Sequence, residues 1–297
     1  MATGGNRPMV IVFNPAAGRR RAHLLWRVLD PLVASGIRLE IVETMRRGDA
    51  RTLARDAAAK GARLVVAAGG DGTIAEVSNG LIGSEAALGV IPLGTANVLA
   101  HEIGLPFLPS AIAAALAFGR TRPLWPGVAQ GPNGVRLFVQ MLGAGFDAQV
   151  VHRLPLPLKR LFGRGAYALQ TARELIRYRF PPIHLRVDGQ EHRAGSVIIS
   201  KGRLYGGRYL LAPEALAHEP GFSVVLFERS GPLAALLCGA LLPLGLLPRA
   251  PGLRRLRARR VEILGGTAAP VQADGDEAGW APLSITDAAA PIRVVAA

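Results

Sequence analysis

Short apolar or alternating runs are interleaved with segments of helical periodicity through the first part of the chain. The runs stand at 9–13, 38–43, 63–68 and 87–91, and each has the length of a strand. Segments with apolar residues near helical spacing follow them, for example Ile74, Val77 and Leu81. This alternation predicts a three-layer α/β domain with a parallel sheet over residues 1–123.

The pattern changes after a stretch rich in proline and glycine at 121–133. Strand-like runs then dominate, at 136–142, 183–188, 195–200, 222–227, 261–264 and 270–273. Helical periodicity remains only at 165–178 and 231–247. We therefore predict a second domain, an antiparallel all-β sandwich over residues 124–287, with a last strand within 288–297 that packs back onto the first domain.

The junction between the run at 63–68 and the helical segment after it reads Gly69-Gly70-Asp71-Gly72-Thr73. Three glycines allow a sharp turn and leave backbone N–H groups free to face an anion at the positive end of the helix. A carboxylate inside a phosphate site makes chemical sense if Mg²⁺ or a proton transfer lies between the two. The alternative is a glycine-rich turn that only closes a βα unit.

Two other strand ends carry similar polar turns. The first runs from Asn14 to Gly18 and is followed by arginines 19–21, which predicts a second anion site or an ordinary loop. The second turn contains Thr95, whose hydroxyl suits a phosphate oxygen or a helix N-cap.

Near the end of the chain, Asp274 and Asp276 flank Gly275. Carboxylates two positions apart around a glycine can point the same way, so that one removes a proton while the other lies near a metal. A plain acidic loop is the alternative, and Glu277 is a substitute for Asp276 as the base.

The motif at 69–73, followed by Glu76 and by Pro92-Leu93-Gly94-Thr95-Ala96-Asn97, resembles the diacylglycerol kinase catalytic family, which includes sphingosine kinases and bacterial lipid kinases. NAD kinases share only the Gly-Gly-Asp-Gly piece. Further matches extend the resemblance over nearly the whole chain, at 143–148, at Lys159 with Gly165 and Tyr167, at 205–213 and at 272–276. The resemblance implies an NAD-kinase-like sheet in the first domain.

The resemblance implies an ATP-dependent lipid kinase that transfers the γ-phosphate to the hydroxyl of a lipid such as diacylglycerol, in the cleft between the domains. The implied nucleotide-binding residues are Asn14, Gly18, Thr44, Gly69, Gly70, Asp71, Gly72, Thr73, Glu76, Thr95 and Asn97. The implied catalytic residues are Asp71, Asp274 and Asp276, with Asp71 also holding Mg²⁺. Asp276, Asp274 and Asp71 all remain open as the general base. Asp147, within the match at 143–148, is expected to orient the lipid hydroxyl or to stabilise a turn.

The chain departs from the family pattern at several acids. Val98, Trp125 and Ser223 stand where the family often has aspartate, so we expect its structural Mg²⁺ site to be absent or altered. Asp276 replaces a glutamate and is one methylene shorter, which can slow or redirect catalysis. Two alternatives follow: a lipid-binding homologue with weakened catalysis, or an NAD kinase.

The net charge of +14 favours anionic partners. Six arginines gather at 249–260 beside the apolar stretch at 231–247. That stretch is too short and too interrupted by proline to span a bilayer, and we expect it to form a buried or interfacial helical hairpin. We predict contact with a membrane surface rather than nucleic acid, with a solvated basic loop as the alternative. Cys238 is the only cysteine, and the N-terminus lacks an apolar signal, so we expect a cytoplasmic, peripherally membrane-associated protein of unknown oligomeric state.

Overall fold

The computed structural model describes residues 8–18, 22–132, 134–155, 164–264 and 269–296. The chain divides into unit 1, Met1–Leu124 with Ala290–Ala297, and unit 2, Trp125–Ala289. Arginines 19–21 of the first predicted anion site and Lys159 of the family resemblance lie outside the described residues.

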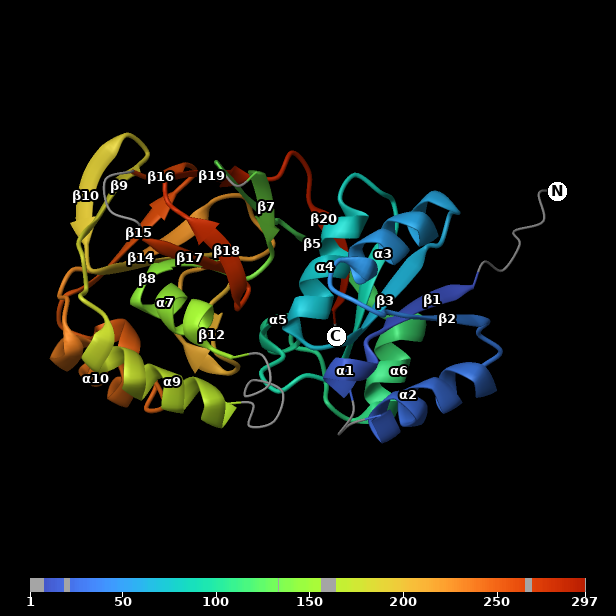
Figure 1. The fold of residues 1–297 in the computed structure, drawn as a ribbon. Coiled ribbons are helices and arrows are strands. Elements are labelled where there is room, and N and C mark those ends of the chain that lie inside the picture. Colours follow the sequence, from blue (N-terminus) through green and yellow to red (C-terminus); the bar gives the residue numbers. More distant parts are fainter. Residues whose placement is uncertain (1–7, 19–21, 133, 156–163, 265–268, 297) are drawn as a thin grey trace. The chain divides into compact units, whose positions relative to one another are not determined.

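Unit 1 is built on a six-stranded sheet (Figure 1). Its order is β2 (Leu39–Glu43), β1 (Met9–Phe13), β3 (Leu64–Gly69), β4 (Ala87–Pro92), β20 (Ile292–Ala296) and β5 (Arg120–Leu124). All neighbours are parallel except β20 and β5. The predicted parallel sheet is confirmed, with one antiparallel edge strand that the sequence pattern did not predict. Most residues of β5 are exposed, so this strand lacks the apolar signature of its neighbours. Its described partner in the sheet is β20, which lies far from it in the sequence.

Two helices cover each face of this sheet. On one face α2 (Ala22–Ala34) packs against α6 (Pro109–Phe118), and the core there joins Leu25 and Ile112 to Ile11 of β1. On the other face α3 (Asp49–Ala59) packs against α4 (Asp71–Leu81). Gly80 permits this close crossing, since a Cβ there would lie 2.4 Å from the carbonyl oxygen of Arg51. The three predicted layers are thus present.

Unit 2 is a sandwich of two antiparallel sheets, each with six strands. The first sheet has the order β10 (Gln190–Ala194), β9 (Ile183–Val187), β16 (Val261–Ile263), β19 (Leu283–Asp287), β6 (Gly127–Gly131) and β7 (Gly134–Phe138). The second has the order β15 (Leu253–Ala258), β14 (Phe222–Phe227), β11 (Ser196–Ser200), β8 (Met141–Gly145), β17 (Pro270–Ala273) and β18 (Asp276–Trp280). Their inner faces share one core, in which Leu185 and Ile285 of the first sheet join Val197 and Val224 of the second. The predicted all-β sandwich is confirmed.

Several elements of unit 2 differ from the sequence-based expectation. The helix α7 (Phe146–Arg153) follows β8 directly, and the predicted run 136–142 is divided between β7 and β8. The strand β15 lies within the arginine-rich run, which was expected to be a loop or a membrane contact. The apolar stretch at 231–247 was expected to be a buried or interfacial helical hairpin, but it forms one helix, α10 (Pro232–Leu241), in which no residue is buried. The helix α9 (Arg164–Arg177) corresponds to the predicted helical segment at 165–178.

Candidate functional site

Asn14 links the first two polar turns of unit 1. Its Nδ2 donates to Oγ1 of Thr73 at 2.9 Å, and its backbone N–H donates to the carbonyl oxygen of Ala68 at 3.0 Å. Its Oδ1 accepts from the N–H groups of Ala16 and Ala17, at 3.0 and 3.3 Å, and so caps the short helix α1 (Pro15–Gly18). The turn after β1 and the glycine-rich turn after β3 are therefore held side by side.

The glycines of the turn at 69–73 let it pack closely against the turn after β4. A Cβ on Gly94 would lie 2.5 Å from Cα of Gly70, and a Cβ on Gly69 would lie 2.5 Å from Oγ1 of Thr73. Both positions require glycine, because a side chain at Gly94 would clash with the backbone of Gly70 and one at Gly69 would clash with the side chain of Thr73. Three strand-end turns of the parallel sheet are thus joined at its carboxyl edge, where ligands of such sheets bind.

Asp71 fixes the third turn in place. Its Oδ2 accepts from the N–H of Asn97 at 2.9 Å, and its Oδ1 accepts from the N–H of Val98 at 2.6 Å, so the carboxylate caps the helix α5 (Val98–Glu102). Asn97 holds a left-handed backbone conformation, φ 50°, that aims both N–H groups at the carboxylate. Burial raises the pKa of Asp71, and these backbone hydrogen bonds act in the opposite direction. The expected metal-binding role of Asp71 stays a prediction.

These turns offer donors suited to phosphate. Within the part of the chain that the structure describes, the N–H groups of Gly72 and Thr73, in the first turn of α4, make no hydrogen bond, and neither do those of Gly94, Thr95 and Ala96. The Thr95 side chain is exposed. Unpaired N–H groups at the positive end of a helix bind anions readily. The residues present therefore fit a polyphosphate.

The remaining predicted nucleotide-binding residues surround the same turns. Oε1 of Glu76 accepts from the N–H of Gly48 at 3.0 Å, which ties α4 to the turn before α3. Thr44 is buried and donates its N–H to Phe13. Asn97 is buried with Nδ2 bonded to Gly94, and its Oδ1 has no partner among the described residues. That buried acceptor is one a ligand or water can satisfy.

In unit 2 the two catalytic candidates of the acid turn have different surroundings. The carboxylate of Asp274 accepts from the N–H groups of Val139, Gln140 and Met141, at 2.8, 2.8 and 3.0 Å. It therefore fixes the junction between β7 and β8, and protonation would cost it some of these bonds. Asp276 begins β18 and is partly exposed. The geometry favours Asp276 over Asp274 as a proton acceptor, and both roles stay predictions.

A cluster of hydrogen-bonded polar side chains holds the backbone of this turn in place. Asp147 accepts from the hydroxyl of Tyr205 and, at 2.9 Å, from Nε2 of Gln272, whose Oε1 accepts from the N–H of Gly275 at 2.8 Å. Burial raises the pKa of Asp147 and that of Tyr205, which the charge of Asp147 raises further. Gly143 leaves room for the cluster, since a Cβ there would lie 2.7 Å from Oδ2 of Asp147. The role of Gln272 was missed in the sequence, although the residue stood in the matched Gln-x-Asp-Gly segment.

The residues at the family's structural metal position do not fit Mg²⁺. The hydroxyl of Ser223 donates to Glu214 at 2.6 Å. The carboxylate of Glu219 lies 3.5 Å from Arg257 and 3.9 Å from the ring of His218. The carbonyl oxygens of Glu219 and Gly221 accept hydrogen bonds from the side-chain ammonium of Lys201. Among the described residues there is no cluster of three or more His, Cys, Asp or Glu side chains that could hold a metal.

Comparison with known proteins places both units in one family. Residues 8–127 match the diacylglycerol kinase catalytic domain, and residues 140–296 match the YegS C-terminal NAD kinase beta sandwich-like domain. The diacylglycerol kinase of Bacillus subtilis strain 168 is 30% identical over 227 residues, which are 74% of this chain and 73% of that protein.

Two further similarities agree with this. A Pseudomonas putida protein named "Probable lipid kinase YegS-like" is 33% identical over 251 residues, 82% of this chain and 80% of its own. The fold matches the crystal structure of a candidate diacylglycerol kinase from Bacillus anthracis strain Sterne with a TM-score of 0.81 and 23% identity, over 98% of this chain and 95% of that one. The chain therefore belongs to the diacylglycerol kinase family of lipid kinases.

Proposed function

We propose that this protein is an ATP-dependent lipid kinase that transfers the γ-phosphate to the hydroxyl of a lipid such as diacylglycerol. The observation that carries the proposal is the joining of three turns in unit 1, through Asn14 with Thr73 and through Asp71 with Asn97. The N–H groups at 72–73 and 94–96, which make no hydrogen bond within the described ranges, form a surface of free donors. Family membership supports a lipid kinase in general, and the nucleotide and the acceptor are part of the proposal.

On the nucleotide side, the N–H groups at 72–73 and 94–96 donate to phosphate oxygens, and the hydroxyl of Thr95 adds one more donor. Asp71 keeps the turn at 94–97 in place through Asn97 and Val98. Mg²⁺ bound to the phosphates, with Asp71 reaching it through water, would neutralise charge during transfer.

On the acceptor side, Asp276 removes the proton of the lipid hydroxyl as the oxygen attacks the γ-phosphorus, and the bond from that phosphorus to the bridging oxygen breaks, which releases ADP. The backbone of the acid turn is fixed by consecutive hydrogen bonds that link Asp147, Gln272 and Gly275. Asp274 anchors the start of the turn through its bonds to backbone N–H groups.

A lipid-binding homologue with weakened catalysis is the second candidate. It is favoured by the three backbone hydrogen bonds of Asp274 and by the shorter side chain of Asp276, which together leave less acid available for chemistry. This candidate predicts retained lipid binding with negligible transfer.

The test is phosphoryl transfer from γ-labelled ATP to lipids in mixed micelles with Mg²⁺. Diacylglycerol, a sphingoid base and a polyprenol serve as separate acceptors, and NAD is supplied in a further reaction to test an NAD kinase. We expect labelled lipid in at least one reaction. No labelled lipid under any metal or detergent condition would reject the kinase, and labelled NADP with no labelled lipid would favour the NAD kinase.

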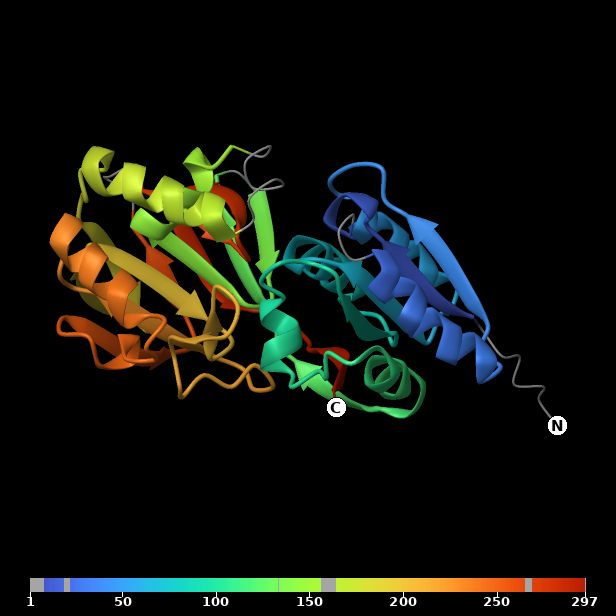
Figure 2. The ribbon, with the colours of Figure 1, turned by 90° about the horizontal axis from the view of Figure 1, so that it is seen from below.

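We further propose that unit 2 contacts a membrane through α10. Three large apolar side chains of this helix are exposed, those of Leu233, Leu236 and Leu237, and α9 lies beside it (Figures 1 and 2). No helix among the described residues is long and apolar enough to cross a membrane. Exposed leucines on a short helix suit shallow insertion into a bilayer.

The arginine run contributes less charge than its composition indicates. On β15, Arg254, Arg255 and Arg257 pair with glutamates at distances of 3.8, 3.2 and 3.5 Å. These pairs offset much of the positive charge that was expected to attract a membrane. The apolar helix is therefore the stronger part of the proposed contact.

A further inference from the structure

Unit 2 buries a lysine ammonium deep in its structure. Lys201 follows β11, its backbone N–H donates to Gln140 at 2.8 Å, and its side chain is 0% exposed. Lysine is almost never fully buried unless it is paired, because removing its charge from water is costly. The surroundings of this ammonium must therefore offset that cost.

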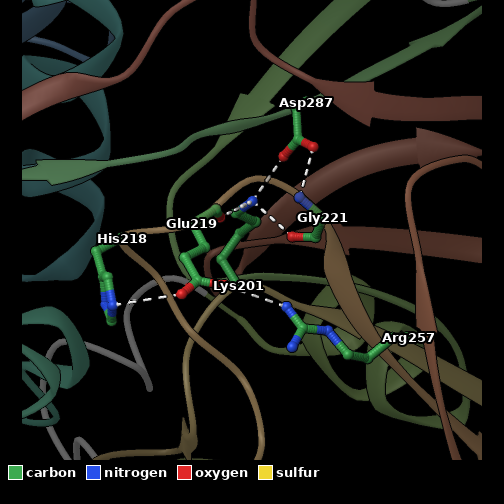
Figure 3. A network of polar contacts seen from close by, with 6 residues as sticks. All are labelled: Lys201, His218, Glu219, Gly221, Arg257 and Asp287. Carbon is green, nitrogen blue, oxygen red and sulfur yellow. Dashed lines mark hydrogen bonds and ion pairs between the residues drawn. The ribbon is translucent and has the colours of Figure 1, made fainter.

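The ammonium is held by a set of oxygens (Figure 3). Nζ donates to the carbonyl oxygen of Gly221 at 2.7 Å, to Oδ1 of Asp287 at 2.6 Å and, at the longer distance of 3.4 Å, to the carbonyl oxygen of Glu219. The ring of Phe222 lies 4.7 Å from Nζ, measured to the ring centroid. Three acceptors match the three N–H groups that only the protonated amine has.

Main-chain carbonyls together with a carboxylate are the ligands that hard cations take in proteins. Of the carboxylates that the structure describes, only that of Asp287 contacts the ammonium, and the side chain of Glu219 turns instead toward Arg257 and His218. Asp287 completes the arrangement, since its Oδ2 accepts from the N–H of Gly221 at 2.6 Å. The ammonium and Asp287 thus join the turn at 219–221 to the end of β19.

We propose that the ammonium of Lys201 is the resident cation of unit 2 and takes the place of a structural metal ion. Lys201 directly follows β11, and its ammonium binds the carbonyl oxygens of Glu219 and Gly221, just before Ser223, where the family often has an aspartate of its structural Mg²⁺ site. Burial lowers the pKa of Lys201 and the contact with Asp287 raises it, so the carboxylate favours the charged form. As a consequence, unit 2 keeps its fold without a divalent cation.

The first test is thermal unfolding of the full chain without nucleotide, in EDTA and in Mg²⁺ or Ca²⁺. We expect the wild-type midpoint to be the same in all three. Lys201→Met keeps the length of the side chain but leaves the largely buried carboxylate of Asp287 without the ammonium, and it should lower the midpoint by about 6–15 °C. Lys60→Met, the same change at an exposed lysine, should leave the midpoint unchanged.

The second test asks whether the oxygens form a cation site. Lys201→Ala removes the ammonium and opens space beside the two carbonyls and Asp287. Added Ca²⁺, Mg²⁺ or propylammonium should raise the midpoint of this variant, but not that of Lys201→Met, in which the side chain fills the space. A Lys201→Ala midpoint that none of these cations raises would overturn the assignment.

Thermal unfolding of the wild type in EDTA and in Mg²⁺ tests the proposal even if neither variant folds. A wild-type midpoint that falls in EDTA and recovers with Mg²⁺ would show that unit 2 depends on a metal, against the proposal. Because every readout is stability without nucleotide, failure of this inference is distinct from failure of the proposed kinase reaction.

Discussion

Replacing Asp71 with asparagine separates the structural and chemical roles that meet at this side chain. Each carboxylate oxygen accepts one backbone N–H, from Asn97 at 2.9 Å and from Val98 at 2.6 Å. Asparagine keeps one acceptor and turns an NH₂ group toward the other N–H, which is left unpaired. An unpaired buried donor costs about 1–3 kcal/mol, so the free energy of unfolding should fall by that amount while the chain still folds.

The same change removes the negative charge that is proposed to reach Mg²⁺ through water. Loss of an outer-sphere partner of a metal costs about 10–100-fold in activity, so phosphoryl transfer should fall at least that far. Urea denaturation measures the stability term, transfer to diacylglycerol measures the rate, and amide hydrogen exchange at Asn97 and Val98 reports whether the cap has opened.

Asp49→Asn is the matched control for Asp71→Asn. Asp49 begins α3, and its carboxylate also accepts two backbone N–H groups, those of Met45 and Arg46 in the turn before the helix, both to Oδ2 at 2.9 Å. This variant weakens a comparable pair of backbone hydrogen bonds outside the three turns, and its transfer rate should stay at the wild-type value. If Asp71→Asn shows the stability loss with an unchanged rate, Asp71 only caps α5 and the reasoning about its charge is refuted.

Three further predictions concern unit 2. Asp276→Asn should lower turnover by about 10² or more with lipid binding retained. Glu277→Gln, a change at an exposed side chain, should change turnover little. The reverse pattern would show that Glu277 is the base. Because burial raises the pKa of Asp147 above 3.8, the ionised carboxylate disfavours the folded state. The free energy of unfolding of the wild type should therefore fall relative to Asp147→Asn as pH rises from about 4 through the raised pKa. Urea titrations across this range check it, and a difference that grows in favour of the wild type would contradict it. Leu233→Asp with Leu236→Asp should reduce sedimentation with anionic vesicles at an unchanged melting temperature, whereas equal binding by variant and wild type would reject α10 as the contact.

The sequence predicts the fold best where strands are buried on both faces. β3 and β4 are almost entirely buried and read as short apolar runs between helices. The strands β10 and β15 are polar edge strands with few buried residues, so periodicity gives them no strand signal. The pairing of β20 with β4 joins Arg293 to Ala87, which are far apart in the chain, so no local pattern encodes the place of β20 in the sheet.

The candidate site was predictable as far as its glycine turns, because glycine spacing and polar strand ends are local features. The bond between Asn14 and Thr73 spans 59 positions, and the cap of Asp71 on Val98 spans 27. Such contacts depend on the sheet order and on the left-handed backbone of Asn97. The burial of Lys201 is invisible in sequence for the same reason, since Asp287 lies 86 positions away.

The position of β20 between β4 and β5 means that the residues of unit 2 interrupt those of unit 1. On the ribosome, the first unit has made all of its helices and five of its six strands long before its sixth strand emerges. The sandwich, which is contiguous in sequence, needs no strand from this last segment, whereas the sheet of unit 1 does. A chain truncated just before Ile292 would therefore hold every strand of the sandwich but lack an interior strand of the first sheet.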